Sequence, residues 1–390
     1  MAVTLADVAA RARVSTATVS RVLNGNYPVA ESTRARVLRA VADLEYVVNG
    51  PASALAAATS DLVGLLVNDI ADPFFGVIAS AVQAEMSRGV ERRTGGGTGT
   101  RTGDNGTSRT GAPLRTGGAG RIPGDGHRLV PADEKLAVVC NTGGSPEREL
   151  TYLTLLQRQR AAAVVMTGGA VEDPNHAAAV AARLARLAAG GTRVVLCGRP
   201  PVRPEPAVPA PVTLAFDNRG GARRLTEHLI TLGHRHIGYV AGPDSRTTTR
   251  HRLEGHRAAL AAHGVPDPAH RTVHGAYDRA AGYDAALELL RRDAALTAVV
   301  AANDTAALGV CAALRDRGLR IPGDISVAGF DDLPFSADAA PALTTVRLPL
   351  REAGARAGRL AMGREAPPPG GIATIRAELM VRESTSVPYS

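Results

Sequence analysis

Tryptophan is absent from this 390-residue chain, and five Phe and seven Tyr residues supply all of its aromatic side chains. So few aromatic rings argue against a surface that stacks the bases of single-stranded nucleic acid. Cysteine is scarce as well: Cys140, Cys197 and Cys311 lie far apart in apolar stretches. We interpret them as buried thiols, because their spacing matches neither a metal site nor a disulfide framework.

Long apolar runs are also missing. No stretch of about twenty uninterrupted apolar residues occurs, so we expect no membrane span and no membrane partner. Asp7, Arg11 and Arg13 interrupt any apolar run at the start of the chain, which argues against a signal peptide and predicts a cytoplasmic protein. The net charge of +8 comes almost entirely from arginine, since Lys135 is the sole lysine. This charge fits a nucleic-acid partner without establishing one.

Catalytic signatures are missing too, because the chain contains no HExxH, GxSxG or paired CxxC pattern. His234 and His236 flank Arg235 just before a predicted strand; a metal pair is conceivable there, but we interpret both as surface-loop residues. We therefore predict no catalytic residue, no metal site and no cofactor. An enzyme built on the same α/β layers stays open as an alternative, because fold does not imply function.

The stretch VTLADVAARARVSTATVSRVLN (3–24) predicts two short helices joined by a tight turn. Thr4 can cap the first helix, with Asp7 three residues later as in a capping box, and Ser15 can cap the second. On the second helix, successive residues turn by about 100°, so one arc is apolar and suited to burial. The opposite, outward arc consists of Thr16, Ala17, Ser20 and Arg21.

The outward arc suits the major groove of DNA, where Arg pairs with guanine edges, Ser and Thr reach phosphates or bases, and Ala meets thymine methyl groups. An ordinary pair of surface helices is the alternative. A third helix is predicted over residues 31–45, with Val37, Leu38, Val41 and Leu44 on one face. Three short helices of this kind form a minimal helix-turn-helix core, which favours DNA binding.

TLADVAARARVSTATVSRVLN and TRARVLRAVADLEYVVN resemble the headpiece of the lactose-repressor/galactose-repressor family of bacterial transcription regulators. The resemblance implies a headpiece over residues 1–46 that binds double-stranded operator DNA. The chain departs from the family at Ala30, where a Ser usually caps the third helix, and loss of that cap costs about 1 kcal/mol. The DNA-binding residues that the resemblance implies here are Thr4, Ser15, Thr16, Ala17, Ser20, Arg21 and Asn24.

Residues 47–60 (VVNGPASALAAATS) follow as a small-residue segment that alone reads as a flexible linker. The resemblance implies a hinge instead, one that folds on operator DNA and wedges Leu55 into the minor groove. Family members often carry an Arg just before this leucine, where this chain has Ala52, Ser53 and Ala54. We therefore expect fewer phosphate contacts from the hinge.

Residues 61–390 alternate short apolar strands with helical segments, which predicts parallel sheets covered on both faces. Ligands of such sheets bind beyond the carboxyl ends of the strands. In this chain that rule selects Asn68, Asp69, Gly198, Asp217, Asn303, Asp304, Asp331 and Asp332.

The family resemblance extends over this region through DIADPFF, RLEGHRAAL, AANDTAALG and IPGDISVAGFDD. It implies a core similar to periplasmic sugar-binding proteins: two doubly wound subdomains, crossed several times by the chain, with a small-molecule effector between them. VRLPL, around Val346, resembles a crossover, and residues 373–382 resemble the last strand of the second subdomain. The implied effector-binding residues are Asp69, Phe74, Phe75, Arg252, Tyr277, Asn303 and Asp331.

Structural alternatives stay open for several of these residues. Arg252 could pair only with a helix neighbour, Phe74 and Phe75 could belong to the core, and Asp331 could cap a turn. Many relatives carry an Asp after the LCG-type strand, where this chain has Gly198 and then an Arg. One sugar-hydroxyl contact is therefore in doubt, and the identity of the effector stays open.

Residues 89–135 interrupt the α/β pattern with a segment rich in Gly, Arg and Thr and nearly free of apolar side chains. Such a segment cannot bury enough surface to offset its ordering entropy, so we predict a disordered surface insert. An auxiliary electrostatic arm for DNA is the functional alternative.

Together these patterns predict an α/β protein with a three-helix headpiece and a periplasmic-binding-protein-like core. The predicted function is a sequence-specific transcription regulator, a repressor of sugar or related metabolite genes, controlled allosterically by an effector. Helix-turn-helix geometry predicts a homodimer that reads a near-palindromic site. A sugar-binding module or transport receptor that shares only the core is a further alternative, disfavoured by the headpiece.

Overall fold

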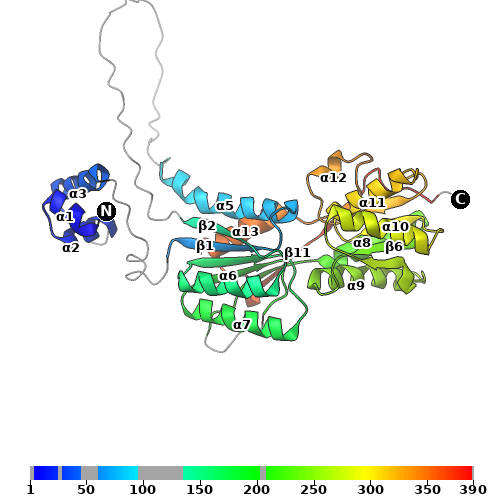
Figure 1. Ribbon diagram of the computed structural model, residues 1–390, viewed down its shortest axis with the longest axis horizontal. Helices are drawn as coiled ribbons and strands as arrows, with labels where there is room; N and C mark the ends of the chain where they lie inside the picture. The colour runs from blue at the N-terminus through cyan, green and yellow to red at the C-terminus, as the bar shows by residue number, and fades with distance from the viewer. Residues whose placement is uncertain (1–3, 25–28, 45–59, 95–134, 203–207, 389–390) are drawn as a thin grey trace, which may run out of the picture. The chain divides into compact units, whose positions relative to one another are not determined.

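The computed structural model describes residues 4–24, 29–44, 60–94, 135–202 and 208–388 (Figure 1). The chain divides into two compact units, one with the three N-terminal helices and one with the sheets. Almost all of the predicted hinge, including Leu55, and most of the predicted insert lie outside the described residues.

Three helices form the headpiece: α1 (Leu5–Ala12), α2 (Thr16–Asn24) and α3 (Glu31–Asp43). The capping box predicted for α1 is confirmed, since Asp7 N donates to Thr4 Oγ1 at 3.4 Å and Thr4 N donates to Asp7 Oδ2 at 2.8 Å. The cap predicted for α2 is confirmed by a 3.2 Å bond from Thr18 N to Ser15 Oγ. Ala30, which precedes α3, makes no side-chain capping bond.

The headpiece has its own apolar core. Val8, Val19 and Val37, one from each helix, are fully buried. An exposed ion pair between Arg11 and Asp43, with 2.8 Å between Nη2 and Oδ2, links α1 to the end of α3. The arc of α2 that we predicted to face inward therefore packs against the other two helices, and the opposite arc faces outward.

The first lobe of the larger unit is a six-stranded parallel sheet in the order β11-β5-β4-β3-β1-β2. Helices α5 (Pro73–Thr94) and α13 (Leu350–Ala361) cover one face, and α6 (Pro146–Arg158) and α7 (Pro174–Ala189) cover the other (Figure 1). The strands are β1 (Leu62–Val67), β2 (Leu136–Asn141), β3 (Ala163–Thr167), β4 (Arg193–Cys197), β5 (Val212–Phe216) and β11 (Ile372–Ile375).

The second lobe is a four-stranded parallel sheet in the order β7-β6-β8-β9. Tyr239 packs into the apolar cluster shared with α8 and α9, whereas Val240 packs into the cluster of α10 and α11, so both faces are covered. The strands are β6 (Ile237–Ala241), β7 (Thr272–His274), β8 (Ala298–Ala301) and β9 (Ser326–Ala328). The helices are α8 (Asn218–Leu232), α9 (Thr247–Ala262), α10 (Arg279–Arg292), α11 (Asp304–Asp316) and the short α12 (Phe335–Asp338).

The chain passes between the lobes from β5 to α8, from β10 (Thr345–Arg347) to α13, and from β11 to β12 (Glu378–Met380). The predicted single last strand over 373–382 is wrong. Its first part, β11, joins the sheet of the first lobe beside β5, and its second part, β12, pairs antiparallel with β10. Both parts are short extended segments, so the sequence pattern does not reveal which sheet each one joins.

Helix α13 was not predicted, and helix α5 is longer than expected. The inward face of α13 consists largely of alanine and glycine, with Gly354 and Gly358 set against the backbone of α5, so few large apolar side chains mark the helix in the sequence. Helix α5 continues to Thr94, past residue 89, where we placed the start of the insert. All three cysteines are free and buried, as predicted.

We expect Ala30→Ser to stabilise the headpiece by about 1 kcal/mol, because a serine hydroxyl can accept from the uncapped first-turn amides of α3. Amide hydrogen exchange in α3 of the full chain should slow by about fivefold, the factor that corresponds to this free energy. Ala30→Val adds bulk without an acceptor and serves as the control. Equal exchange in the two variants would contradict the capping argument.

Candidate functional site

A cavity of about 450 Å³ lies between the two lobes, at the carboxyl ends of their strands. In the first lobe, Asn68 and Asp69 follow β1 and Gly168 follows β3, at the point where the strand order reverses. In the second lobe, Pro243 after β6 and Asn303 after β8 take the equivalent place. Parallel sheets bind ligands at such switch points, and the volume suits a small molecule.

All the residues that we predicted to bind an effector line this single cavity, although their role there stays a prediction. The first lobe contributes side chains from the β1–α5 segment, and the second contributes side chains from four different segments. They are Asp69, Phe74, Phe75, Arg252, Tyr277, Asn303 and Asp331.

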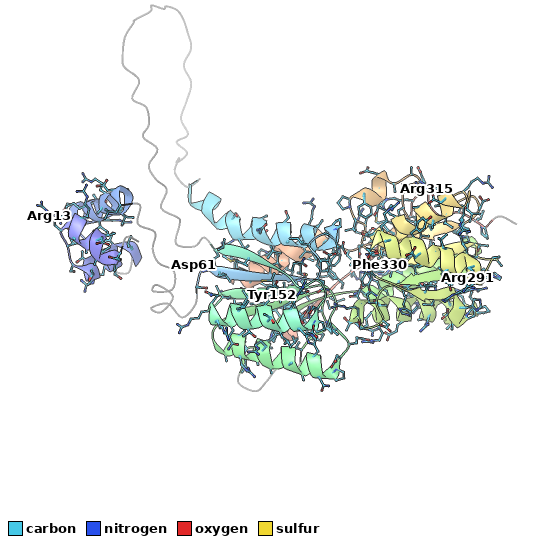
Figure 2. The ribbon with its side chains drawn as sticks, in the orientation of Figure 1. Arg13, Asp61, Tyr152, Arg291, Arg315 and Phe330 are labelled. Atoms are coloured by element: carbon cyan, nitrogen blue, oxygen red, sulfur yellow. The ribbon has the colours of Figure 1, made fainter. Side chains whose placement is uncertain are left out.

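Arg252 is the most completely bonded side chain of the lining. Its Nη2 lies 2.6 Å from Asp331 Oδ1, its Nε donates to Asn218 Oδ1 at 2.9 Å, and its Nη1 donates to the carbonyl of Ala302. The guanidinium carbon lies 3.8 Å from the ring centroid of Phe330, which is labelled in Figure 2. Arg252 therefore does not pair with a helix neighbour, and Asp331 does more than cap a turn.

Burial shapes the electrostatics of this pair, since Arg252 and Asp331 are each only 3% exposed. Burial raises the pKa of the Asp331 carboxyl, and the charge of Arg252 acts in the opposite direction. The same carboxyl raises the pKa of Arg252 against the effect of burial. The guanidinium therefore stays charged, and its acceptors hold it in one position.

Aromatic rings form the apolar wall of the cavity. The ring centroids of Phe74 and Phe75 lie 5.0 Å apart, and those of Phe74 and Phe216 lie 6.2 Å apart, both edge to face. Phe74 and Phe75 are each 8% exposed and also pack into the core, so the core alternative and the lining role hold together. An aromatic wall of this kind can cover the apolar face of a sugar ring.

Tyr277 and Asn303 are held by bonds within the second lobe. The hydroxyl of Tyr277 lies 2.6 Å from Thr249 Oγ1, and its carbonyl accepts from Asn303 Nδ2 at 3.0 Å. A Cβ at Gly242 would lie 2.3 Å from the Tyr277 ring, so only glycine allows this approach. Asn303 also caps α11 through Ala306 N.

Several polar lining residues were not among our predicted site residues. Asp72 and Asp278 each stand directly before a helix that follows a strand, a signal that could have revealed them. The others also lie within a few residues of the carboxyl ends of β5, β6 and β8, but farther along the chain than the residues that the strand-end rule selected. The complete set is Asp72, Asn218, Ser245, Arg246, Thr248, Asp278 and Thr305.

Three strand-end carboxylates that the sequence rule selected do not line the cavity. Asp217 caps α8, and Asp332 pairs with Arg382 at 2.6 Å. Asp304 is fully buried and accepts from Thr345 Oγ1 at 2.5 Å, and burial raises the pKa of its carboxyl to about 6. These side chains hold the second lobe and its crossover together instead.

Gly198 lines the cavity, whereas Arg199, the next residue, does not. Gly198 lines the cavity with a φ of 86°, a conformation that favours glycine. Arg199 is 5% exposed, is not part of the lining, and donates to Glu149 Oε1 at 3.1 Å. Glu149 Oε1 also lies 3.2 Å from His176 Nε2. The arginine therefore joins the segment after β4 to α6 inside the first lobe.

The surface-loop interpretation of His234 is wrong. His234 is 1% exposed, and its ring nitrogens lie 2.9 Å from Thr297 Oγ1 and 2.9 Å from the carbonyl of Ser386, because the C-terminal segment covers the loop. Burial lowers the pKa of His234. Over the described ranges, no three His, Cys, Asp or Glu side chains group as a metal site. No helix in those ranges is long and apolar enough to cross a membrane.

The predicted DNA-binding residues of the headpiece lie along α2 and at the helix starts. Thr16, Ala17 and Arg21 are exposed, and Ser20 is half-buried. Thr4 and Ser15 are also exposed, although both hydroxyls already take part in caps. Asn24 ends α2, and its side chain lies outside the described part of the headpiece.

Comparison with known proteins decides the family. The description "Bacterial regulatory proteins, lacI family" matches residues 4–49, and "Periplasmic binding protein-like domain" matches residues 226–385. The HTH-type transcriptional regulator GalR of Escherichia coli (strain K12) is 32% identical over 361 residues, which cover 92% of this chain and 88% of GalR. The chain belongs to the LacI family of bacterial regulatory proteins.

Solved structures agree with the family assignment. A structure described as "transcriptional regulator CelR-cellobiose complex" is 28% identical, with a TM-score of 0.61, and the match covers 98% of this LacI-family chain and 99% of that one. The lac repressor dimer bound to operator and the anti-inducer ONPF is 25% identical, with a TM-score of 0.72 and coverage of 99% and 100%. The named relatives are transcription regulators rather than enzymes.

In this LacI-family chain, we expect either half of the Arg252–Asp331 pair to be costly to remove alone. Asp331→Asn and Arg252→Met should each lower the free energy of unfolding by about 3–5 kcal/mol, because each leaves a buried partner without its counter-charge. The double variant should lose less than the sum of the two. Urea unfolding of all four proteins tests this expectation, and additive losses would show that the pair is not coupled.

Proposed function

We propose that this LacI-family regulator acts in the cytoplasm as a homodimer that represses sugar-related genes from a near-palindromic operator. A small hydroxyl-rich effector bound between the lobes controls its affinity for DNA. The observation that carries the proposal is the combination in one chain of the outward arc of α2 with a polar cavity between two α/β lobes.

For DNA binding, the support comes from the surface of α2. Val19 and Val22 anchor the helix in the headpiece core, which leaves Thr16, Ala17 and Arg21 exposed on the opposite side. Arg21 supplies a guanidinium for guanine edges, and the two small residues allow close approach to the groove. Leu55 remains the proposed minor-groove wedge.

For the effector, the support comes from the composition of the lining. Rings of Phe75 and Phe216 offer apolar contact, and the side chains of Asp69, Asn303 and Thr305 offer hydrogen bonds. Such a mixture is typical of sites for sugars and related polyols. The CelR relative, whose structure is described as a cellobiose complex, is consistent with this ligand class.

For allosteric control, the support comes from bonds that join the lobes beside the cavity. Arg246 Nη2 donates to the carbonyl of Gly144 at 2.5 Å, and the amide of Thr247 donates to the carbonyl of Ala170 at 3.0 Å. An effector that touches both lobes binds one relative position of the lobes better than another. It therefore shifts the population between states with different DNA affinity, a coupling of about 1–3 kcal/mol in typical cases.

We predict that Arg21→Ala weakens binding to the specific operator by about 1–3 kcal/mol, the usual worth of a bidentate base contact. Fluorescence anisotropy with the intergenic DNA upstream of the coding region measures this, with unrelated DNA as competitor at two salt concentrations. Arg39→Ala removes another exposed arginine, on α3, and is the matched control. Equal losses of operator affinity in both variants would show that Arg21 acts only through its positive charge and not through a base contact.

We also predict that a neutral sugar changes the operator affinity of the full chain through the cavity. Screening mono- and disaccharides in the same anisotropy assay identifies it. Asp69→Ala should weaken the response to that sugar by about tenfold, since it removes a hydrogen-bond acceptor from the lining. Asp338→Ala removes an exposed carboxylate outside the lining and should leave the response unchanged. A response that survives in Asp69→Ala would place the effector elsewhere.

A further inference from the structure

Several helices begin at the cavity, and their N-terminal ends contribute to its electrostatic potential. Among the described elements, α5, α8, α9, α10 and α11 each contribute residues of their N-terminal ends to the lining. Helix N-termini attract anions, because their first amides have no intrahelical acceptor. Five such ends around one cavity would ordinarily favour a phosphate or carboxylate ligand.

This chain supplies its own acceptors at four of these five described helix starts. Asp72 Oδ1 accepts from Phe74 N at 2.9 Å on α5, and Asp278 Oδ1 accepts from Ala281 N at 2.8 Å on α10. Equivalent caps hold α8 and α11, through Asp217 and Asn303. The fifth helix, α9, has no side-chain cap, but its Thr247 amide donates to the carbonyl of Ala170.

Both arginines of the described lining are likewise engaged. Arg252 is bonded to Asn218, Ala302 and Asp331, as described above. Arg246 donates to the carbonyl of Gly144 in the opposite lobe. The described part of the lining contains no lysine, no histidine and no third arginine. Each of these guanidinium groups is therefore held in place by acceptors of the protein itself.

Carboxylates add a repulsive element at one end of the cavity. Asp69 is exposed, accepts one bond from the amide of Ala71, and lies close enough to Asp72 for their charges to interact. Burial raises the pKa of Asp72 and the charge of Asp69 adds to that shift, whereas the amide of Phe74 and the charge of Arg252 oppose it. Asp278 supplies another carboxylate to the lining. The negative charge of an anionic ligand would therefore be repelled by several carboxylates in a partly desolvated site.

A hydroxyl partner is also present. The buried Oγ1 of Thr305 lines the cavity and has no hydrogen-bond partner within the described protein. A buried polar atom of this kind gains when a ligand group bonds to it. Because a threonine hydroxyl both donates and accepts, it matches a ligand hydroxyl particularly well.

We infer that this cavity selects its ligand by charge: it accepts neutral or cationic hydroxyl-rich molecules and rejects phosphorylated or carboxylated sugars. The inference rests on the proposed function, since it names the chemical class of that same effector. The discriminating side chains are Asp69 and Asp72, which repel anions, and Thr305 contributes a bond to a ligand hydroxyl.

The test is isothermal titration of the full chain, at low and moderate salt, with matched ligands. Glucose, galactose, maltose and cellobiose are titrated first. The sugar that binds is then compared with its 6-phosphate, its uronic acid and its 2-amino analogue. We expect the amino analogue to bind about as well as the neutral sugar or better, and the two anionic analogues to bind at least about tenfold more weakly, most clearly at low salt.

Isosteric variants test the origin of that discrimination. Asp69→Asn and Asp72→Asn remove charge but keep an oxygen acceptor and, for Asp72, the helix cap. Both should reduce the ratio of the affinity for the neutral sugar to the affinity for its anionic analogues. Asp338→Asn, on an exposed residue outside the lining, should leave this ratio unchanged. Thr305→Val, of nearly equal volume, should weaken binding of the neutral sugar.

Each outcome separates the inference from the proposed function. Tight binding of a sugar phosphate or uronate, or an unchanged ratio in both Asn variants, overturns charge selection and leaves an effector-controlled regulator in place. Failure of all neutral, cationic and anionic sugars to bind a chain that still binds its operator overturns the sugar-effector part of the proposed function, and the inference with it.

Discussion

The buried guanidinium of Arg252 bonds to three separate segments of the second lobe. Its three nitrogens reach the start of α8, the end of β8 and the end of β9, and its flat face covers the ring of Phe330. A buried cation is tolerated only when its donors find acceptors, because desolvation otherwise outweighs the attraction. The cation therefore requires these three segments to meet at one point, and that point is the wall of the cavity. The shape of the site follows from satisfying one charge.

Helix caps extend the same logic around the cavity. Asp72, Asp278 and Asn303 each cap the start of a helix by accepting a hydrogen bond from a first-turn amide. Each of them also lines the cavity. Parallel strands bring such helix starts together because every strand in a sheet delivers its carboxyl end to the same edge. The residues that shape the local backbone thus also set the charge of the site. This double use gives helix starts at the cavity an acceptor from the protein itself.

The headpiece depends on a separate set of interactions. Eight buried apolar side chains among its described residues form a cluster of their own, and its capping bonds connect residues three positions apart. The regulatory core has its own apolar clusters in the two lobes. Because each unit has an apolar core of its own, the headpiece and the lobes each have the means to stay folded while the lobes change position. That separation is what an allosteric regulator needs: two stable parts and an equilibrium that a ligand can bias.

The sequence by itself determined the features that depend on near neighbours. The three headpiece helices with their caps, the alternation of strands and helices, and the position of Asp69, Asn303 and Asp331 after strands all arise from contacts within a few residues or from one hydrophobic period. Only the tertiary structure decided the rest. It paired Arg252 with Asp331, 79 residues away, instead of with a helix neighbour, and it placed β11 in the first lobe. It also showed α13, whose small residues pack closely on α5, and the bond between Arg246 and the carbonyl of Gly144 in the opposite lobe. These features depend on which surfaces meet across the fold, and the pattern of a local segment is the same whichever surface it meets.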